Sequence, residues 1–314
     1  SFGQGTYHWR ESWHFTAGLR YTDETKDFEG FVSPDYFNAS AFERQGEQSQ
    51  DWSQVSWKLV AAYDFNEVSM GYASITNGFK SGGWNADFVT SLDNIYFEEE
   101  HATNYEIGYK SKYYDNKLTF NIAAFVTKFT DFQVFQFVTV GEGQTELRLT
   151  NAGEASTQGI ELDTQFNLSD NFTLNFNASF VEAVFDSFKD GGGAGIDYDG
   201  NMLPYAPELR SYISLDYSKH LDNDKRLYAH LDANYSSETY SNPNNANDHK
   251  MPEQHTINAR VGIEIAQSWN ISLWAKNLTD ETNLRFQDTS FLQIPRGYYD
   301  EPRKDGQSIL YNYD

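Results

Sequence analysis

The feature of this sequence that most restricts its fold is a strict alternation of apolar and polar residues over long segments. Residues 118–127 and 172–180 show it most clearly, on either side of a long third segment. In 172–180 one set of positions holds Phe172, Leu174, Phe176, Ala178 and Phe180, and the other holds Thr173, Asn175, Asn177 and Ser179. Successive side chains of a β-strand point to opposite faces, so each segment predicts a strand with one apolar and one polar face.

The same pattern recurs along the chain and predicts about thirteen strands. They lie near 1–9, 13–22, 55–63, 68–72, 105–109, 118–127, 145–168, 172–180, 209–217, 227–236, 257–265, 271–275 and 309–313. Short turns alternate with long connections, which we expect at about 27–50, 80–101, 188–206, 241–253 and 276–305. An antiparallel meander places all short turns on one rim and all long loops on the other, as in outer-membrane proteins. We therefore predict an all-β, up-and-down transmembrane β-barrel.

Composition agrees with a barrel and excludes several other classes. The 314 residues carry a net charge of −23, which disfavours nucleic-acid binding, and the absence of cysteine excludes disulfides, thiolate metal sites and cysteine nucleophiles. No apolar run approaches the ~20 residues of a membrane helix. Aromatic residues make up 17% of the chain although mean hydropathy is −0.67. A barrel accounts for both values, because half of each strand faces lipid and half faces water.

Several segments, in order along the chain, resemble the C-terminal part of a TonB-dependent outer-membrane receptor. They are residues 16–22 (TAGLRYT), 77–85 (NGFKSGGWN), 104–111 (NYEIGYKS), 151–155 (NAGEA), 159–162 (GIEL), 203–208 (LPYAPE) and 276–281 (KNLTDE). The final segment, with Tyr311 and Tyr313, resembles the aromatic terminal strand that the barrel assembly machinery reads in this family. Asp314 after the last aromatic residue departs from that pattern.

The resemblance implies a barrel of about 22 strands filled by an N-terminal plug, with a TonB-contacting box near its start. The sequence shows neither plug nor box and begins within a strand pattern without a signal peptide. We therefore expect residues 1–314 to be the C-terminal part of an incomplete barrel, in a Gram-negative outer membrane. Contacts are expected with outer-membrane lipid, with the barrel assembly machinery and, through the missing N-terminal part, with TonB and its inner-membrane energising complex.

The family resemblance also implies the function, which is active uptake of a scarce small-molecule solute rather than catalysis. A ferric siderophore is the expected solute, so iron enters as cargo and no cofactor is expected. Carbohydrate, cobalamin or haem uptake by the same family stays open, as does a passive porin or adhesin. No motif in the chain combines a nucleophile with a base and an orienting acid, so we predict that it is not an enzyme.

Ligand recognition in such receptors implies the extracellular loops and the outer end of the lumen. Aromatic residues with a few cations suit an anionic, aromatic or sugar-bearing ligand. The ligand-binding candidates are Phe79, Lys80, Trp84 and Asn85 in one loop, and Arg285, Phe286, Arg296 and Tyr298 in another. The alternative is that these side chains pack the loops together or belong to the outer aromatic girdle.

A second group of candidates is expected to line the lumen. Alternation places His230 and Asp232 on the polar face of one strand, and Arg260 and Glu264 on that of a neighbour. They would line a solute path or form a hydrated interior network. No metal motif is present: the histidines lack ligand spacing, and the Asp197 region lacks the terminal Glu of a calcium loop.

Overall fold

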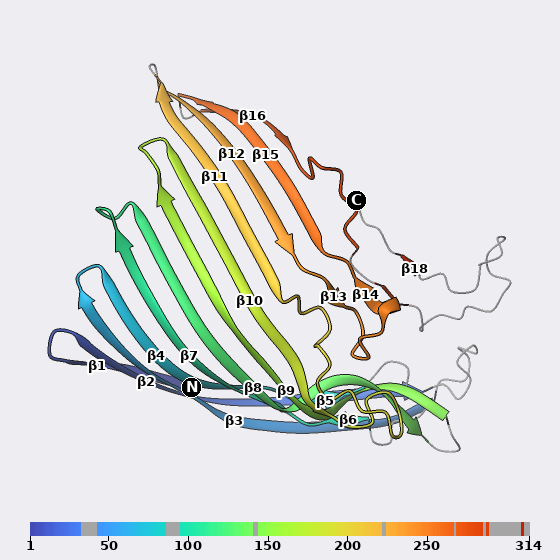
Figure 1. Ribbon diagram of the computed structural model, residues 1–314. Helices are drawn as coiled ribbons and strands as arrows, with labels where there is room; N and C mark the ends of the chain where they lie inside the picture. Colours follow the sequence, from blue (N-terminus) through green and yellow to red (C-terminus); the bar gives the residue numbers. More distant parts are fainter. Residues whose placement is uncertain are drawn as a thin grey trace, which may run out of the picture.

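The structure, a computed structural model, is a single curved antiparallel sheet whose two edges do not meet (Figure 1). It describes residues 1–32, 43–85, 95–140, 144–221, 224–266, 268–284, 287–288 and 309–310. The twelve strands of this sheet, in spatial and chain order, are β1 (Phe2–Trp9), β2 (Trp13–Val32), β3 (Glu43–Asn66), β4 (Ser69–Lys80), β7 (Glu100–Tyr113), β8 (Leu118–Val140), β9 (Gln144–Asn167), β10 (Phe172–Phe188), β11 (Leu209–Leu221), β12 (Lys225–Ser236), β15 (Gln254–Ile265) and β16 (Trp269–Ala275). The prediction of an incomplete up-and-down barrel is confirmed.

Shorter elements lie beside the sheet. The two-residue strands form three pairs: β5 (Gly83–Trp84) with β6 (Tyr96–Phe97), β13 (Thr239–Tyr240) with β14 (Lys250–Met251), and β17 (Gln287–Asp288) with β18 (Ile309–Leu310). A single-turn 3-10 helix, η2, covers Asn247–His249. No helix in the described part of the chain is long and apolar enough to cross a bilayer. The thirteenth predicted strand, at 309–313, is described only as β18, which pairs with β17 and not with the main sheet.

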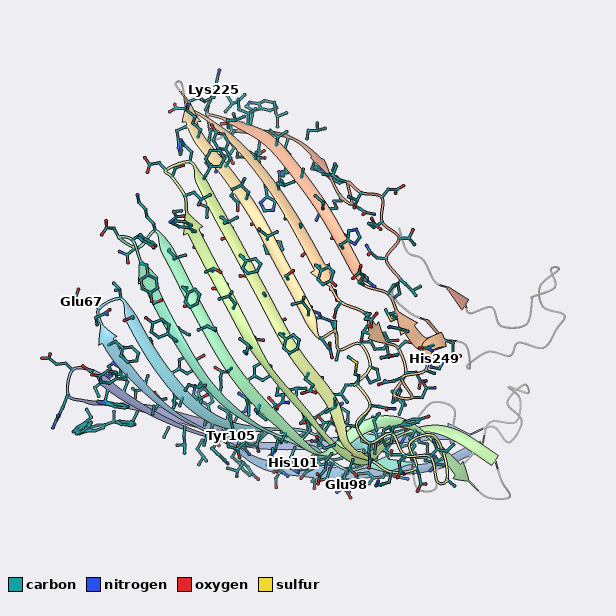
Figure 2. The ribbon with its side chains drawn as sticks, viewed as in Figure 1. Glu67, Glu98, His101, Tyr105, Lys225 and His249 are labelled. Atoms are coloured by element: carbon teal, nitrogen blue, oxygen red, sulfur yellow. The ribbon has the colours of Figure 1, made fainter. Side chains whose placement is uncertain are left out.

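The connections divide between two rims as the sequence predicts. Tight turns join β1 to β2, β3 to β4, β7 to β8, β9 to β10, β11 to β12 and β15 to β16 at one rim, and the long connections lie at the other (Figure 1). The connection from β8 to β9 is an exception, because only three residues separate these strands at the loop rim. Glu67 and Lys225 mark the turn rim, and Glu98 and His249 lie toward the loop rim (Figure 2). Positive φ angles at Arg10, Asp115 and Asp224 close several of the tight turns.

Two strand pairs extend farther than the hydrophobic pattern predicts. In one of them, β8 continues past the expected end at 127 to Val140 and stays paired with β9 as far as Gln144. The expected loop at 27–50 is wrong at both ends, because β2 continues to Val32 and β3 begins at Glu43. In this extension the outward face carries polar pairs: Thr25 donates to Asp51 at 2.7 Å and Ser49 to Asp27 at 2.7 Å. With the outward face polar, the apolar stripe that marks the lipid side disappears although the ladder of strand pairing continues.

Strand pairing separates the two faces of the sheet. In register, Leu174 pairs with Phe166 and Leu215, and Leu231 pairs with Leu215 and Ala259, so apolar rows run across several strands. The registers of β8 and β15 with their neighbouring strands place Phe120 and Ile263 on the same face. This face stays uncovered, with Ile107 65% and Leu231 48% exposed. Such a continuous apolar surface matches a lipid-facing wall, as the alternation predicts.

Aromatic side chains line the outer face near the turn rim. Trp13 contacts Tyr63 with ring centroids 4.9 Å apart, Tyr63 contacts Phe65 at 5.3 Å, and Phe65 contacts Tyr109 at 6.0 Å. Farther along the sheet, Tyr114 packs near Phe166 and Phe172 near Tyr217. This row is typical of the aromatic girdle that marks a membrane–water interface.

On the opposite face, two tyrosines lie over glycines of the next strand. A Cβ atom added to Gly108 would meet the ring of Tyr72 at 2.4 Å, and one added to Gly262 would meet the ring of Tyr228 at 2.5 Å. The Tyr72 hydroxyl donates to Glu106 at 2.6 Å, and the Lys110 ammonium lies 5.4 Å from the Tyr72 ring centroid. Each glycine thus provides the space that its tyrosine fills.

Candidate functional site: the lumen wall and its outer mouth

The polar face of the sheet is its concave face. A hollow of about 680 Å³ is lined by residues from β4 through β15, and residues that far apart share a pocket only on the inside of the curve. Its charged lining residues are Lys110, Glu161, Asp163, Arg210 and His255. The sheet therefore has an apolar outer wall and a polar inner wall, which we call the lumen wall.

A hydrogen-bonded network crosses the lumen wall at the predicted lumen residues. His230 lies between two carboxylates, with its Nδ1 2.6 Å from Asp216 Oδ1 and its Nε2 3.2 Å from Asp232 Oδ1. Asn258 continues the network by donating to Asp232 Oδ2 at 2.8 Å. Arg260 pairs in register with His230 and donates to the Ser272 hydroxyl at 3.1 Å.

Glu264 forms a separate pair on the same face. Arg226 donates two hydrogen bonds to its carboxylate, from Nε at 2.8 Å and from Nη2 at 2.6 Å. The sequence analysis missed Arg226, although the β12–β15 register that aligns His230 with Arg260 also aligns Arg226 with Glu264. The structure brings the predicted lumen residues onto one face, and their part in solute passage stays a prediction.

At the loop rim the connection between β4 and β7 folds onto the lumen wall. Trp84 packs 5.6 Å from Phe28 and 5.8 Å from Trp52, measured between ring centroids. The Lys26 ammonium lies 5.0 Å from the Trp52 ring centroid and donates to Ser81 Oγ at 2.5 Å and to the Gly82 carbonyl at 2.9 Å. Lys26, Phe28 and Trp52 point inward from β2 and β3, so this aromatic cluster lines the outer mouth of the lumen.

Asn85, predicted to bind ligand, anchors this connection. Its side chain is 8% exposed. Its Nδ2 donates to the carbonyls of Ile95 at 3.0 Å and Leu149 at 2.9 Å, while its Oδ1 accepts from the Leu149 amide at 2.6 Å. The oxygen and the nitrogen of the side-chain amide are therefore both hydrogen-bonded to backbone groups. This geometry supports a role for Asn85 in attaching the loop to β9.

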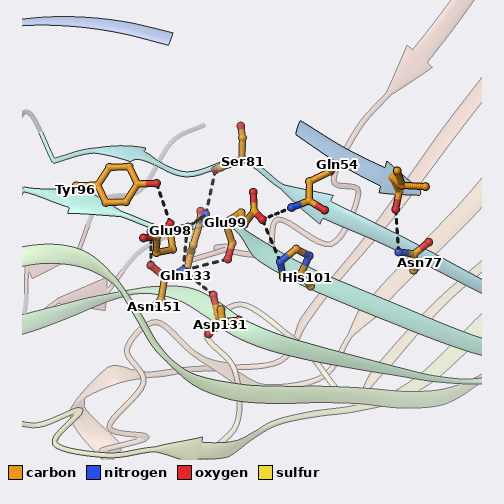
Figure 3. Close-up of polar contacts among 11 residues, drawn as sticks. Gln54, Asn77, Ser81, Tyr96, Glu98, Glu99, His101, Asp131, Gln133 and Asn151 are labelled. Atoms are coloured by element: carbon orange, nitrogen blue, oxygen red, sulfur yellow. Dashed lines mark hydrogen bonds and ion pairs between the residues drawn. The ribbon is translucent and has the colours of Figure 1, made fainter. Parts of the chain in front are cut away.

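Gln133 and Asn151 hold the second half of the same connection (Figure 3). Gln133 Nε2 donates to the carbonyls of Ser81 at 3.1 Å and Glu98 at 2.9 Å. Asn151 accepts from the Glu98 amide at 2.6 Å and donates to the Glu98 carbonyl at 2.9 Å. The Tyr96 hydroxyl donates to Glu98 at 2.8 Å, and burial, with this hydrogen bond, raises the pKa of Tyr96 to about 12. The described part of the loop is thus fixed to the wall at several points.

Substitution of Asn85 by alanine tests this anchoring. The change removes the side-chain partner of the Leu149 amide and carbonyl, while the Ile95 carbonyl keeps the backbone amide of Asn85 at 2.8 Å. Each unsatisfied buried group costs about 1–3 kcal/mol. We expect amide hydrogen exchange to accelerate around residues 81–85 and 95–99, while the strands below stay protected. Asn121→Ala is the control, because Asn121 donates only to Asp163 on the open lumen wall. Equal exchange in the two variants would contradict the anchoring role.

The remaining ligand candidates separate in the structure. Lys80 lies on the inward face of β4, exposed, and has no hydrogen bond or ion pair with the described residues. Phe79 lies on the outward face of the same strand, in register with His101, which places it with the outer-wall residues. Lys80 and Trp84 line an open pocket of about 580 Å³ together with Lys26 and Gln133. Arg285, Phe286, Arg296 and Tyr298 fall outside the described residues.

A second buried unit at the loop rim was missed by the sequence analysis. Phe185 and Phe188 pack with Ala155, Ala183 and Leu203, and the connection after β10 closes over them. The expected strand 172–180 stops short of these residues, because β10 continues to Phe188 with its apolar residues Val181, Ala183 and Phe185 on the opposite face, which breaks the alternation. This core fixes the connection between β10 and β11 against the wall.

Ion pairs hold the tip of that connection. Lys189 donates to Asp197 at 2.9 Å and to Asp199 at 2.5 Å. The backbone amide of Asp190 and the Lys189 ammonium lower the pKa of Asp197, and the same ammonium with the Phe188 amide lowers the pKa of Asp199. Both carboxylates are thus engaged by Lys189 within the loop.

These depressed pKa values predict an acid-sensitive loop tip. The ion pairs stabilise the loop fully above the unfolded aspartate pKa of about 3.9, and this contribution is lost as pH falls through the lower folded values. We expect intrinsic-rate-corrected hydrogen exchange at residues 188–200 to be unchanged between pH 7 and 5 and to rise below pH 4. Lys189→Met should raise exchange already at pH 7. An unchanged profile in this variant would contradict the ion-pair account.

Comparison with known proteins agrees with this architecture. Residues 1–278 match the family model described as TonB dependent receptor-like, beta-barrel. The pesticin receptor of Yersinia pestis is 23% identical over 282 residues, covering 88% of this chain and 38% of that protein. The chain therefore spans well under half the length of this relative.

Solved structures show the same fold. The ferric yersiniabactin uptake receptor FyuA from Yersinia pestis superposes with a TM-score of 0.77 at 18% identity, covering 99% of this chain and 43% of that one. The ferric-catecholate import receptor Fiu from K12 E. coli gives a TM-score of 0.67 at 15% identity, covering 90% and 40%. These are receptors and not enzymes. Because the family model matches residues 1–278, which are most of this chain, the chain belongs to the TonB-dependent receptor β-barrel family of outer-membrane proteins.

Proposed function

We propose that this chain forms part of the wall of an outer-membrane receptor that binds a ferric siderophore at its outer mouth and imports it. Relatives named as receptors for ferric yersiniabactin and ferric catecholates support this class of solute. The energy would come from TonB and its inner-membrane complex, and insertion would require the barrel assembly machinery. Iron is cargo in this proposal and not a cofactor of the protein.

The observation that carries the proposal is the pocket at the mouth. Lys80 offers an ammonium without a partner among the described residues, and Trp84 and Lys26 lie beside it. Gln133 also lines the pocket, and its buried Oε1 accepts no hydrogen bond there. A cation and an aromatic ring that line the same pocket suit an anionic, aromatic chelate.

The test uses the complete receptor in a strain starved of iron. Lys80→Ala should weaken binding of the recognised ferric siderophore about tenfold, since one charge-assisted hydrogen bond is worth at least about 1.4 kcal/mol. Trp84→Ala should also weaken binding, through loss of ring contact and loop packing. Lys112→Ala is the control, because Lys112 lies on the same face near the turn rim.

Uptake assays separate the proposal from its rivals. Uptake of ferric siderophore that requires TonB supports it. Equal binding by Lys80→Ala, Trp84→Ala and the control would exclude the mouth pocket as the binding site. Uptake of carbohydrate, cobalamin or haem instead would overturn the proposed solute, and solute passage independent of TonB would indicate a passive pore.

A further inference from the structure

Two histidines face each other on the lumen wall beside the β1–β2 turn, at the opposite rim from the mouth. His8 and His14 are direct cross-strand partners. Their Nδ1 atoms are 2.6 Å apart, and their rings meet edge to face with centroids 4.7 Å apart at 75°. Two imidazole nitrogens thus face each other at hydrogen-bond distance, and the sequence analysis did not single out either residue.

A carboxylate on the next strand orients one of these rings. His14 Nε2 lies 2.6 Å from Asp64 Oδ2. Asp64 is itself held, because its backbone amide donates to the Ser12 carbonyl at 2.8 Å. With Nε2–H donating to the carboxylate, the lone pair of His14 lies on Nδ1, which points toward His8. A carboxylate behind a ligating histidine is the usual outer partner of such a ligand in metal sites.

We propose that His8 and His14 chelate a divalent first-row transition-metal ion, such as Cu²⁺, Ni²⁺ or Zn²⁺, through their Nδ1 atoms, with Asp64 positioning His14. Metal–nitrogen bonds of about 2.0–2.1 Å place two adjacent nitrogens roughly 2.9–3.4 Å apart. The two Nδ1 atoms therefore separate by a few tenths of an ångström on binding. The proton shared between them moves through solvent to Nε2 of His8 as the metal–nitrogen bonds form, so both rings stay neutral and both Nδ1 lone pairs bind the metal.

The site is a two-ligand chelate completed by water. No group of three or more His, Cys, Asp or Glu side chains within the described ranges is arranged to hold a metal ion. His8 Nε2 has no hydrogen bond to any described residue, so no contact there fixes its ring. Imidazole ligands suit Cu²⁺, Ni²⁺ and Zn²⁺ better than Ca²⁺ or Mg²⁺, which prefer oxygen.

The experiment uses the complete receptor, purified in detergent and titrated with Cu²⁺. We expect saturable binding, and electron paramagnetic resonance of the bound ion should show coupling to two imidazole nitrogens. His8→Gln and His14→Gln should each weaken binding at least tenfold and remove one nitrogen from the spectrum. Asp64→Asn should weaken binding about 10–100-fold while both nitrogens remain. His220→Gln, on the same face near the same rim, is the control and should leave binding unchanged.

Several results would overturn the proposal. The first is absence of saturable Cu²⁺ binding, and the second is wild-type affinity for Cu²⁺ in His8→Gln. The third is a spectrum that still shows coupling to two imidazole nitrogens in both histidine variants. Because His14 and not His8 is bonded to Asp64, the His8 variant remains informative if His14→Gln fails to fold. If Asp64→Asn binds Cu²⁺ with wild-type affinity, Asp64 does not position His14, and this result would overturn that part of the proposal. Ferric siderophore binding at the mouth is measured separately, so failure at one rim leaves the other proposal standing.

Discussion

Replacing Gly108 with valine is expected to destabilise the barrel by at least about 1–3 kcal/mol, the usual cost of adding atoms to a packed site. The Tyr72 ring occupies the space that a Cβ atom would need, at 2.4 Å. The ring cannot move aside freely, since its hydroxyl is bonded to Glu106 and its face lies under the Lys110 ammonium. The expected result is a lower urea midpoint for unfolding of the complete receptor in micelles, with less folded barrel in the outer membrane.

Gly78 provides the matched control on the same sheet. A Cβ atom at Gly78 meets nothing within 4 Å, so Gly78→Val should leave the midpoint close to that of the wild type. Removing the ring in the double variant Gly108→Val/Tyr72→Ala should recover part of the loss. Equal effects at Gly78 and Gly108 would contradict the account, since strand propensity and not ring packing would then be responsible.

Arginine at position 124 is expected to cost about 2–4 kcal/mol, the penalty for a cation on the lipid-facing surface near the centre of the bilayer. Ala124 lines an apolar hollow of the outer wall with Ile107 and Ala73. Arginine at the adjacent position 123 should be tolerated, because Ala123 points into the lumen and pairs in register with Glu161.

Ala124→Arg and Ala123→Arg change the same residue type at adjacent positions of one strand. The change in strand propensity and in side-chain size is therefore the same in both variants and cancels when they are compared. The measurement is the amount of folded, heat-modifiable receptor recovered from outer membranes. A strong loss for Ala124→Arg alone agrees with the assignment of faces. A larger loss for Ala123→Arg would reverse it.

Most of the wall could be predicted from the sequence, because alternation records which side of each strand meets lipid. The apolar residues that alternate along the strands, such as Leu174 and Leu231, lie in register on the lipid-facing side across the sheet. The signal ends where the outward face becomes polar, as at Thr25 and Asp51, so strand ends toward the loop rim were placed too early. The ladder of backbone hydrogen bonds that continues there depends on the partner strand and leaves no pattern in composition.

The candidate site was less accessible to sequence reasoning. The polar face of His230 and Arg260 follows from alternation, but the partners Asp216 and Arg226 depend on register between strands. Asn85 illustrates the other limit: its position in a loop rich in aromatic residues suggested ligand contact, whereas three hydrogen bonds to backbone engage its amide. Loop packing of this kind is a tertiary property without a periodic signal.

The assignment of the two faces is tested most directly by single-cysteine spin labelling along β10 in the complete receptor. These 314 residues contain no cysteine. With any cysteine elsewhere in the receptor replaced by serine, each label from 172 to 180 reports one position of this segment. Labels at Phe172, Leu174, Phe176, Ala178 and Phe180 should relax with oxygen dissolved in lipid, and those at Thr173, Asn175, Asn177 and Ser179 with a water-soluble nickel chelate. Alternation with period two and this phase supports the account; the opposite phase, or no alternation, would contradict it.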